Sequence, residues 1–163
     1  MKASGRLRLL ANLRPSLTVE AARKVYISMI VPLLTYTGTI HLNLTNTQLQ
    51  KLSSIEKRAS KIISTNATLP KIHQLIKKDA CLQVRKCLNH DVCNNFRNYF
   101  KLLTHNNNTR NNKLLLRIPR VKLTFAKKSF YFTGATMYND LPIDIRKEKD
   151  HSAYKKLLTD YFV

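Results

Sequence analysis

The 163-residue sequence predicts a mainly α-helical fold: a small helical bundle, an Asn-rich linker, a short extended segment and a terminal amphipathic helix. Three observations support this prediction. Apolar residues recur every three or four positions over most of the chain, which is typical of amphipathic helices. Side chains that can cap a helix precede several of these runs. Alternation of polar and apolar residues, which is typical of a strand, is confined to residues 120–125.

The N-terminal part is predicted to begin with two helices. A short basic helix covers residues 6–14, where leucines and arginines are interspersed. A longer run extends from Thr18 to about Thr37, with Thr18 or Ser16 placed to cap its N-terminus. Pro32 lies inside this run and has no amide hydrogen, so we expect the helix to kink there or to break into two.

The clearest helical signal follows Thr45. Thr45 and Gln48 have the spacing of a capping box, and an amphipathic run begins directly after them. A solvated surface is the simple explanation for the cations of this run. Contact with a polyanion is the alternative, because only Glu56 offsets them. These cations are Lys51, Lys57, Arg58 and Lys61.

The next part of the chain contains the predicted domain boundary. Residues 69–103 are predicted to form a helical region that divides near Asp79. The polar, low-complexity residues 105–113 are predicted to form a linker. We therefore expect a helical domain over residues 1–104 and a C-terminal extension with a short strand and a helix over residues 114–163.

Within this extension the aromatic residues 129–138 predict a short helix, and Ser152 is placed to cap a final amphipathic helix. Lysines precede aromatic residues over residues 127–132, and such a mixture can stack on nucleic-acid bases. A small aromatic core beside solvated lysines is the favoured explanation, because aromatic side chains tend to be buried.

The chain is strongly basic. Twenty-nine Lys and Arg residues face nine Asp and Glu residues, which gives a net charge of +20. Residues 1–128 hold 24 of the basic residues and four of the acids, so all the net charge lies there. A compact protein with such a charge repels itself unless a polyanion neutralises it. Nucleic acid is the leading candidate partner, and an anionic membrane surface is the second.

A membrane-spanning helix is not expected. Residues 25–50 contain no Lys, Arg, Asp or Glu, but polar residues and Pro32 interrupt their apolar part. A spanning helix needs about 20 predominantly apolar residues, and this stretch falls short. A buried helix is the favoured interpretation.

The composition argues against catalysis by this chain alone. The nine acids include no adjacent pair that could hold two metal ions. The three glycines are far apart, which excludes phosphate-binding and dinucleotide-binding loops. No Ser, His or Cys stands in a nucleophile signature. We therefore expect no enzymatic activity from the chain on its own, and no cofactor.

The cysteines are sparse and odd in number. Cys87, His90 and Cys93 have a regular spacing, but in a helix the two cysteines do not face each other, and no fourth residue has suitable ligand spacing. No metal site is therefore expected. Since the N-terminus also lacks a signal-type apolar core, we expect an intracellular protein, in the nucleus or the cytoplasm.

Three groups of motifs follow one another along the chain. The first covers residues 2–7, 22–26 and 31–38, and the second covers residues 49–52 and 55–63. The third lies near the C-terminus and consists of Ser129-Phe130, Tyr138-Asn139-Asp140-Leu141-Pro142, Ile145-Arg146 and residues 152–158.

In this order the motifs resemble the region that follows the catalytic core of jockey-like non-LTR retrotransposon (LINE-type) reverse transcriptases. Residues 55–63 resemble the family's helix of the Gln-Lys-Arg-Ala type, and the third group resembles its terminal pattern. The chain departs from the family in having no Trp, since Tyr138 stands where the family often has Trp before Asn-x-Leu-Pro. The resemblance covers nearly the whole chain.

The resemblance implies the thumb and C-terminal extension of an RNA-directed DNA polymerase, with residues 1–104 as a thumb-like bundle. The family's catalytic aspartates lie in an upstream palm domain, so we expect a fragment that lacks the catalytic palm. The implied partners are RNA or an RNA–DNA duplex, bound through the backbone without sequence preference, and the upstream palm. The candidate contact residues are Arg6, Arg8, Lys51, Lys57, Arg58 and Lys61.

Two alternatives remain open. The chain is either a non-functional relic of a mobile element, with apolar surface exposed in the absence of the palm, or a basic membrane-associated helical protein that uses residues 25–44. Salt-dependent binding to RNA is expected of the polymerase fragment and not of either alternative.

Overall fold

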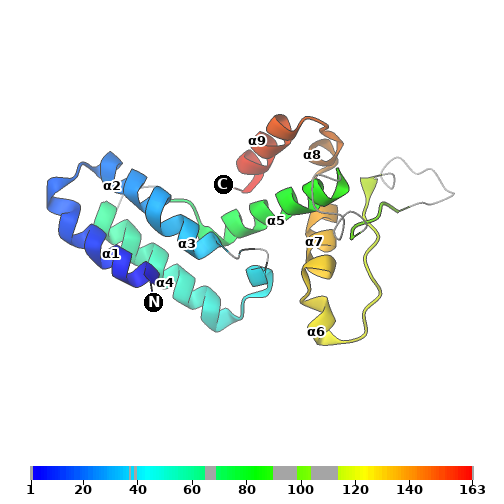
Figure 1. Cartoon of the computed structure of the whole chain (residues 1–163), viewed down its shortest axis with the longest axis horizontal. Coiled ribbons are helices and arrows are strands. Elements are labelled where there is room, and N and C mark those ends of the chain that lie inside the picture. Colours follow the sequence, from blue (N-terminus) through cyan, green and yellow to red (C-terminus); the bar gives the residue numbers. More distant parts are fainter. Residues whose placement is uncertain are drawn as a thin grey trace. The chain divides into compact units, whose positions relative to one another are not determined.

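A computed structural model describes residues 2–36, 38, 40–64, 69–89, 99–103 and 114–162. These residues are mainly helical, as the sequence predicts (Figure 1). The chain forms two compact units, Met1–Ile76 and Lys77–Val163, and each has its own hydrophobic core. This division differs from the predicted boundary at residues 105–113, which lie outside the described residues.

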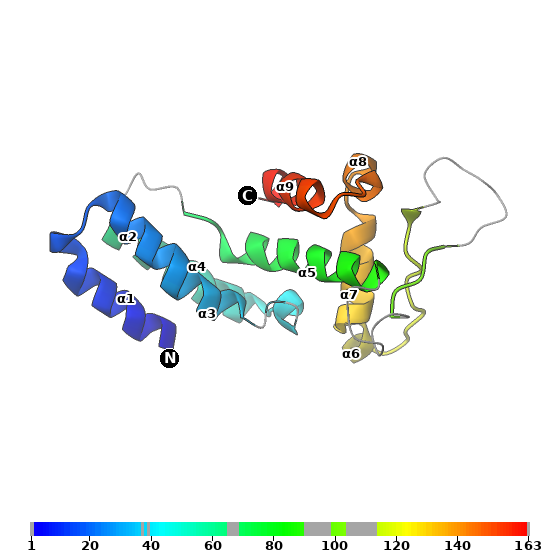
Figure 2. The same cartoon turned by 45° about the horizontal axis from the view of Figure 1, so that its top comes forward.

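The first unit is built on two helices that run in the same direction, α1 and α4, with the α2–α3 segment returning beside them (Figures 1 and 2). Its core contains apolar residues from every long helix of the unit, among them Leu7, Tyr26 and Ala59. The elements in chain order are α1 (Lys2–Leu13), η1 (Arg14–Ser16), α2 (Val19–Val25), η2 (Tyr26–Ile30), α3 (Val31–Thr35), η3 (Ile40–Asn43), α4 (Asn46–Ile63) and the first turn of α5 (Ile72–Leu88).

A π turn, η2, accommodates Pro32 within the second helical run. The N–H of Val31 donates to the carbonyl of Tyr26, five residues earlier, instead of four as in an α-helix. This wider turn precedes a residue that has no N–H and whose ring clashes with the carbonyl four positions back. The predicted division at Pro32 therefore takes the form of a π turn between α2 and α3. Of the two predicted capping residues, Thr18 is the one that caps the run, since its side chain accepts from Ala21 N–H.

Both ends of α4 are held by polar contacts. At its start the capping box is confirmed: Gln48 N–H donates to Thr45 Oγ1 at 3.3 Å, and Thr45 N–H donates to Gln48 Oε1 at 2.9 Å. At its end the guanidinium of Arg14 donates to the carbonyls of Ile62 and Ile63, at 3.1 and 3.0 Å. These bonds satisfy carbonyls that a helix end leaves without a partner in its own helix.

The second unit packs the remainder of α5 with four shorter helices. An antiparallel bridge between Leu102 and Leu116 joins the two described segments that lie between α5 and the C-terminal helices. The core of this unit contains three buried aromatic side chains, those of Phe100, Tyr138 and Tyr154. The helices are α6 (Thr124–Lys127), α7 (Phe130–Asn139), α8 (Ile143–Lys147) and α9 (His151–Phe162).

The prediction of a helix divided near Asp79 was wrong, because α5 is continuous from Ile72 to Leu88. Asp79 is tolerated inside the helix with a partly buried carboxyl group. Burial raises its pKa, and the nearby Lys78 and Lys155 oppose this rise. The helix was also predicted to continue toward residue 103, but residues 99–103 are not helical.

Two further predictions about the C-terminal part were wrong in detail. The short strand or extended segment predicted over residues 120–125 is not a strand: residues 117–122 lie outside helices and strands, and α6 begins at Thr124. The cap of α9 is Asp150 rather than Ser152, since Asp150 Oδ2 accepts from Ala153 N–H at 2.7 Å. The helix over residues 129–138 is confirmed as α7, with Ser129 as its cap.

None of the helices in the described ranges combines the length and the apolar character that crossing a membrane requires.

Candidate nucleic-acid interface

An open groove of about 500 Å³ lies between α1 and α4 in the first unit. Ser4 from α1 forms one wall. The opposite wall comes from the first half of α4, and the groove-lining residues there are Thr47, Gln50, Lys51, Ser54 and Ile55. Beyond the groove the two helices continue in the same direction (Figure 1). At the other end Arg14, which directly follows α1, donates to the carbonyl of Ile62 in α4.

The groove-lining face of α4 continues into a row of exposed cations. Lys51 and Ser54 line the groove, and Arg58 and Lys61 follow Ser54 at intervals of four and three residues. Residues at this spacing share one face of a helix. The side chains of all three cations are exposed to solvent. Three of the predicted contact residues therefore lie in one line.

Arg8 belongs to the same face of α1 as Ser4, which precedes it by four residues. It is exposed. Arg8 thus adds a cation to the α1 side of the groove. Lys57 is exposed as well, but it lies about 100° around α4 from Arg58 and so outside this line.

Arg6 is the predicted contact residue that the structure places elsewhere. It lies about 200° around α1 from Arg8. Its Nη1 donates to the carbonyl of Met29 at 2.8 Å, in the π turn that precedes Pro32. The guanidinium of Arg6 therefore has a partner in the fold, on a different side of α1 from the groove.

The acids of the first unit are both engaged by other groups. This unit contains eleven Lys and Arg residues but only two acids, Glu20 and Glu56. Glu20 forms an exposed ion pair with Lys24 at 3.0 Å on α2. Glu56 Oε1 accepts from the N–H of Ile72 at 2.7 Å and so caps the start of α5. Both carboxylates thus bond to groups other than the cations along the groove.

Several arginines donate hydrogen bonds to backbone carbonyls, and the sequence analysis did not predict these bonds. Arg14 donates to three carbonyls, those of Ile62, Ile63 and Leu17. In the second unit, Arg85 donates to the carbonyls of Arg146 and Glu148, and Arg146 donates to that of Leu141 at 3.0 Å. These arginines contribute to the net charge, but their donors serve the fold.

The aromatic residues of α7 pack as a core, which confirms the favoured explanation for residues 127–132. The rings of Phe130 and Tyr131 lie 5.6 and 5.7 Å from that of Phe100. The exposed aromatic side chain in this region is instead Phe125, which is 86% exposed. Nothing in the apolar pattern of residues 120–125 distinguished Phe125 from a buried strand residue.

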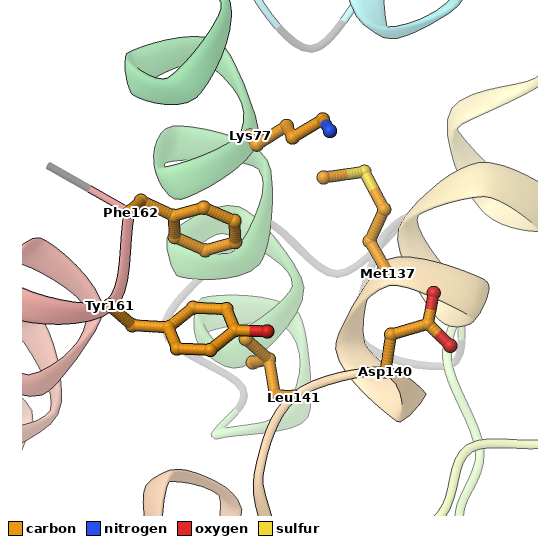
Figure 3. Close-up of a pocket in the computed structure, with 6 residues that line it drawn as sticks. All are labelled: Lys77, Met137, Asp140, Leu141, Tyr161 and Phe162. Carbon is orange, nitrogen blue, oxygen red and sulfur yellow. The ribbon is translucent and has the colours of Figure 1, made fainter.

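A small pocket of about 170 Å³ opens in the second unit between α5, α7 and α9 (Figure 3). Lys77 and Asp140 lie on different sides of it, and Met137, Leu141, Tyr161 and Phe162 supply its other walls. One lysine and one carboxylate do not by themselves indicate a reaction. The buried thiol of Cys81 has its pKa raised to about 12 by burial and by Asp140, so it is a protonated core residue.

The part of the chain that the structure describes contains no cluster of three His, Cys, Asp or Glu side chains suited to a metal ion. Cys87, His90 and Cys93 are the residues whose regular spacing was considered for a metal site. Cys87 is buried in the core of the second unit, whereas His90 and Cys93 lie outside the described residues.

Compared with known proteins, the chain matches no family model, no curated protein and no solved structure. The geometry of the groove and the sequence motifs therefore carry the functional argument.

Proposed function

We propose that the groove between α1 and α4 binds the sugar–phosphate backbone of an RNA duplex or an RNA–DNA hybrid, without reading its sequence. One observation carries this proposal. Lys51 lines the groove, Arg58 and Lys61 extend the same face of α4, and Arg8 shares a face of α1 with the groove residue Ser4; all four are exposed cations. The two acids of the unit, Glu20 and Glu56, bond to other groups.

The side chains of the groove suit phosphate contacts. Lys, Arg, Ser, Thr and Gln are the residue types that donate hydrogen bonds to phosphate oxygens, and such contacts position a duplex without specifying its sequence. From Lys51 to Lys61 the row is about 15 Å long at the rise of an α-helix. That length covers about four base-pair steps of a duplex. The groove thus matches a short stretch of one backbone.

The motifs that resemble non-LTR retrotransposon reverse transcriptases support the same proposal. On this view the chain is the thumb and C-terminal extension of an RNA-directed DNA polymerase, and it holds the template–primer duplex while an upstream palm performs the chemistry. The chain itself is not the catalyst. We propose that it acts in the nucleus or the cytoplasm.

The upstream palm would cover apolar side chains of α1 that the first unit leaves exposed. Leu9 and Leu13 are 62% and 55% exposed and lie one turn apart on α1, away from the groove. The same exposure is what a non-functional relic would show. The two interpretations differ in the affinity that they predict. A thumb binds a duplex with an affinity that falls as salt rises, whereas a relic does not bind it.

The experiment compares two variants of equal charge. In fluorescence anisotropy with a labelled 20-bp RNA–DNA hybrid, we expect Lys51→Gln with Arg58→Gln to weaken binding at least tenfold. The control, Arg23→Gln with Lys71→Gln, removes two exposed cations from other surfaces, and we expect a change below threefold. A second hybrid of scrambled sequence should bind equally well. Equal losses in both variants, or a strong sequence preference, would contradict the proposal.

A further inference from the structure

A second basic surface lies in the other compact unit. The sequence between Lys101 and Asn139 contains no Asp or Glu. Within it, residues 117–128 form an exposed segment that joins the Leu102–Leu116 bridge to α7. Its exposed cations are Arg117, Arg120, Lys122, Lys127 and Lys128.

This segment also exposes apolar side chains. Phe125 is 86% exposed and Leu123 is 72% exposed, so water surrounds both. An aromatic ring that is exposed to this degree within a basic segment is accessible to a ligand that can stack on it. The surface around them carries cations and no acid of its own segment.

The backbone around Phe125 is held at both ends. Before it, Arg117 N–H donates to the carbonyl of Lys101 at 2.8 Å. After it, Ser129 Oγ donates to the carbonyl of Ala126 at 2.7 Å, and Lys128 N–H donates to that of Phe125 at 3.0 Å. Phe125 is therefore presented from a fixed helical turn, which lowers the entropy lost when a ligand covers its ring.

We propose that residues 117–128 form a binding site for a single-stranded polynucleotide, with one base stacked on Phe125 and the phosphates on either side contacted by exposed cations of the segment. Sites for single strands combine these two elements, a basic path for the backbone and an aromatic ring for a base. All residues of this site belong to the second unit, whereas the duplex groove belongs to the first.

Charge alone would also attract an anionic membrane, but the apolar side chains favour a base. Peripheral membrane segments insert the apolar face of an amphipathic helix. Here α6 has only four residues, and the large apolar side chains exposed at it are those of Leu123 and Phe125. One ring satisfies the needs of base stacking, whereas the few exposed apolar side chains of this segment, Ile118, Leu123 and Phe125, would anchor a protein weakly.

The first test measures the affinity of the full chain for a labelled 12-nucleotide oligouridylate. We expect Phe125→Ala to weaken binding about 5- to 140-fold, the range that corresponds to stacking one base. Phe125→Leu keeps apolar area but removes the ring, so it should weaken binding to a similar degree. The same two variants should leave affinity for the 20-bp hybrid unchanged. Full affinity in either variant would overturn the proposal.

The second test uses the absence of tryptophan from the chain. Phe125→Trp should retain affinity for oligouridylate, and binding should quench its indole emission. Tyr36→Trp is the matched control, because Tyr36 is 87% exposed and lies in a stretch without charged residues. The emission of this control should not change.

Two outcomes of the fluorescence test would overturn the proposal. The first is equal quenching by oligouridylate in the Phe125→Trp and Tyr36→Trp variants. The second is a blue shift of the indole emission when the Phe125→Trp variant meets phosphatidylserine vesicles, together with no response to oligouridylate. The second result would assign the surface to a membrane instead of a polynucleotide.

Both tests are to be repeated with Lys51→Gln and Arg58→Gln in the same chain. These substitutions remove groove cations of the first unit, so binding of oligouridylate should keep its dependence on Phe125. If that dependence disappeared with the groove cations, the two surfaces would be one site, and the proposal of a separate site would be wrong.

Discussion

The side-chain amide of Asn139 hydrogen-bonds to both backbone groups of Leu116. Leu116 N–H donates to Asn139 Oδ1 at 2.7 Å, and Asn139 Nδ2 donates to the carbonyl of Leu116 at 2.9 Å. On the other edge of this short stretch, the backbone groups of Leu115 and Arg117 bond to residues 101–103. Asn139 thus completes the pairing of Leu116 as a neighbouring strand would.

Removing this amide should destabilise the second unit. We expect Asn139→Ala to lower the free energy of unfolding by about 2–4 kcal/mol, because it leaves an N–H and a carbonyl of the fully buried Leu116 without partners. Urea denaturation followed by circular dichroism measures the change. Asn12→Ala, at an exposed position of α1, should change stability by less than about 0.5 kcal/mol. Equal effects would refute a specific role for Asn139.

The second prediction concerns Arg14 and separates a structural arginine from the groove cations. Arg14→Lys keeps the charge but loses the planar fork that reaches the carbonyls of Leu17, Ile62 and Ile63. We expect a loss of about 1–3 kcal/mol in stability. Thermal denaturation measures this loss. The control is Arg23→Lys, at an exposed position, and it should leave stability unchanged. If Arg14→Lys were also neutral, these hydrogen bonds would contribute nothing.

The third prediction concerns Tyr26, whose hydroxyl is buried without a hydrogen-bond partner among the described residues. Burial, together with Glu56, raises the pKa of Tyr26 to about 12. The folded state therefore holds this proton more tightly than the unfolded state, whose tyrosine ionises near pH ~10. The contribution of the group to stability is complete below about pH 10 and is lost as the pH rises from about 10 to 12.

Tyr26→Phe should remove this loss and leave stability at neutral pH unchanged or about 1 kcal/mol higher, since it deletes an unpaired buried hydroxyl. Urea midpoints measured at neutral pH and at two alkaline pH values, about 10 and 11, test both statements. A steeper alkaline decline in the Tyr26→Phe variant than in the parent would contradict this explanation.

The fourth prediction compares two glycines in helices. A Cβ at Gly134 of α7 would lie 3.0 Å from Val84 and 3.1 Å from Phe130, whereas a Cβ at Gly5 of α1 would meet nothing within 4 Å. Gly5→Ala should therefore stabilise the chain by up to about 1 kcal/mol, the difference in helix propensity. Gly134→Ala should not give this stabilisation, because the added Cβ has no room. Gly134→Val should lower the free energy of unfolding by about 1–3 kcal/mol through overpacking. A stabilising Gly134→Val would show that α7 can move away from α5.

Local signals in the sequence were sufficient for most helices. The capping box of Thr45 and Gln48 and the cap at Thr18 depend on residues three positions apart, so spacing alone identifies them. Pro32 marked an interruption, but the choice of a π turn depends on packing that spacing does not encode. Asp79 does not break α5, because its neighbours keep the apolar spacing of the helix on both sides of it.

Contacts between distant residues were the part that the sequence could not provide. Glu56 caps α5 and Arg14 caps the end of α4, and each partner lies at least 16 residues away. In the groove, the line of Lys51, Arg58 and Lys61 was predictable from helical periodicity. The position of Arg8 beside it, and of Arg6 away from it, depends on how α1 packs on α4.

The most direct measurement of the central claim is the salt dependence of binding to the RNA–DNA hybrid. If the groove contacts phosphates, Lys51→Gln with Arg58→Gln should reduce the magnitude of the slope of log K against log salt concentration by about 1.8, or about 0.9 for each contact. The control pair Arg23→Gln with Lys71→Gln should leave the slope unchanged. Equal slopes for the parent and the groove variant would contradict the proposed function.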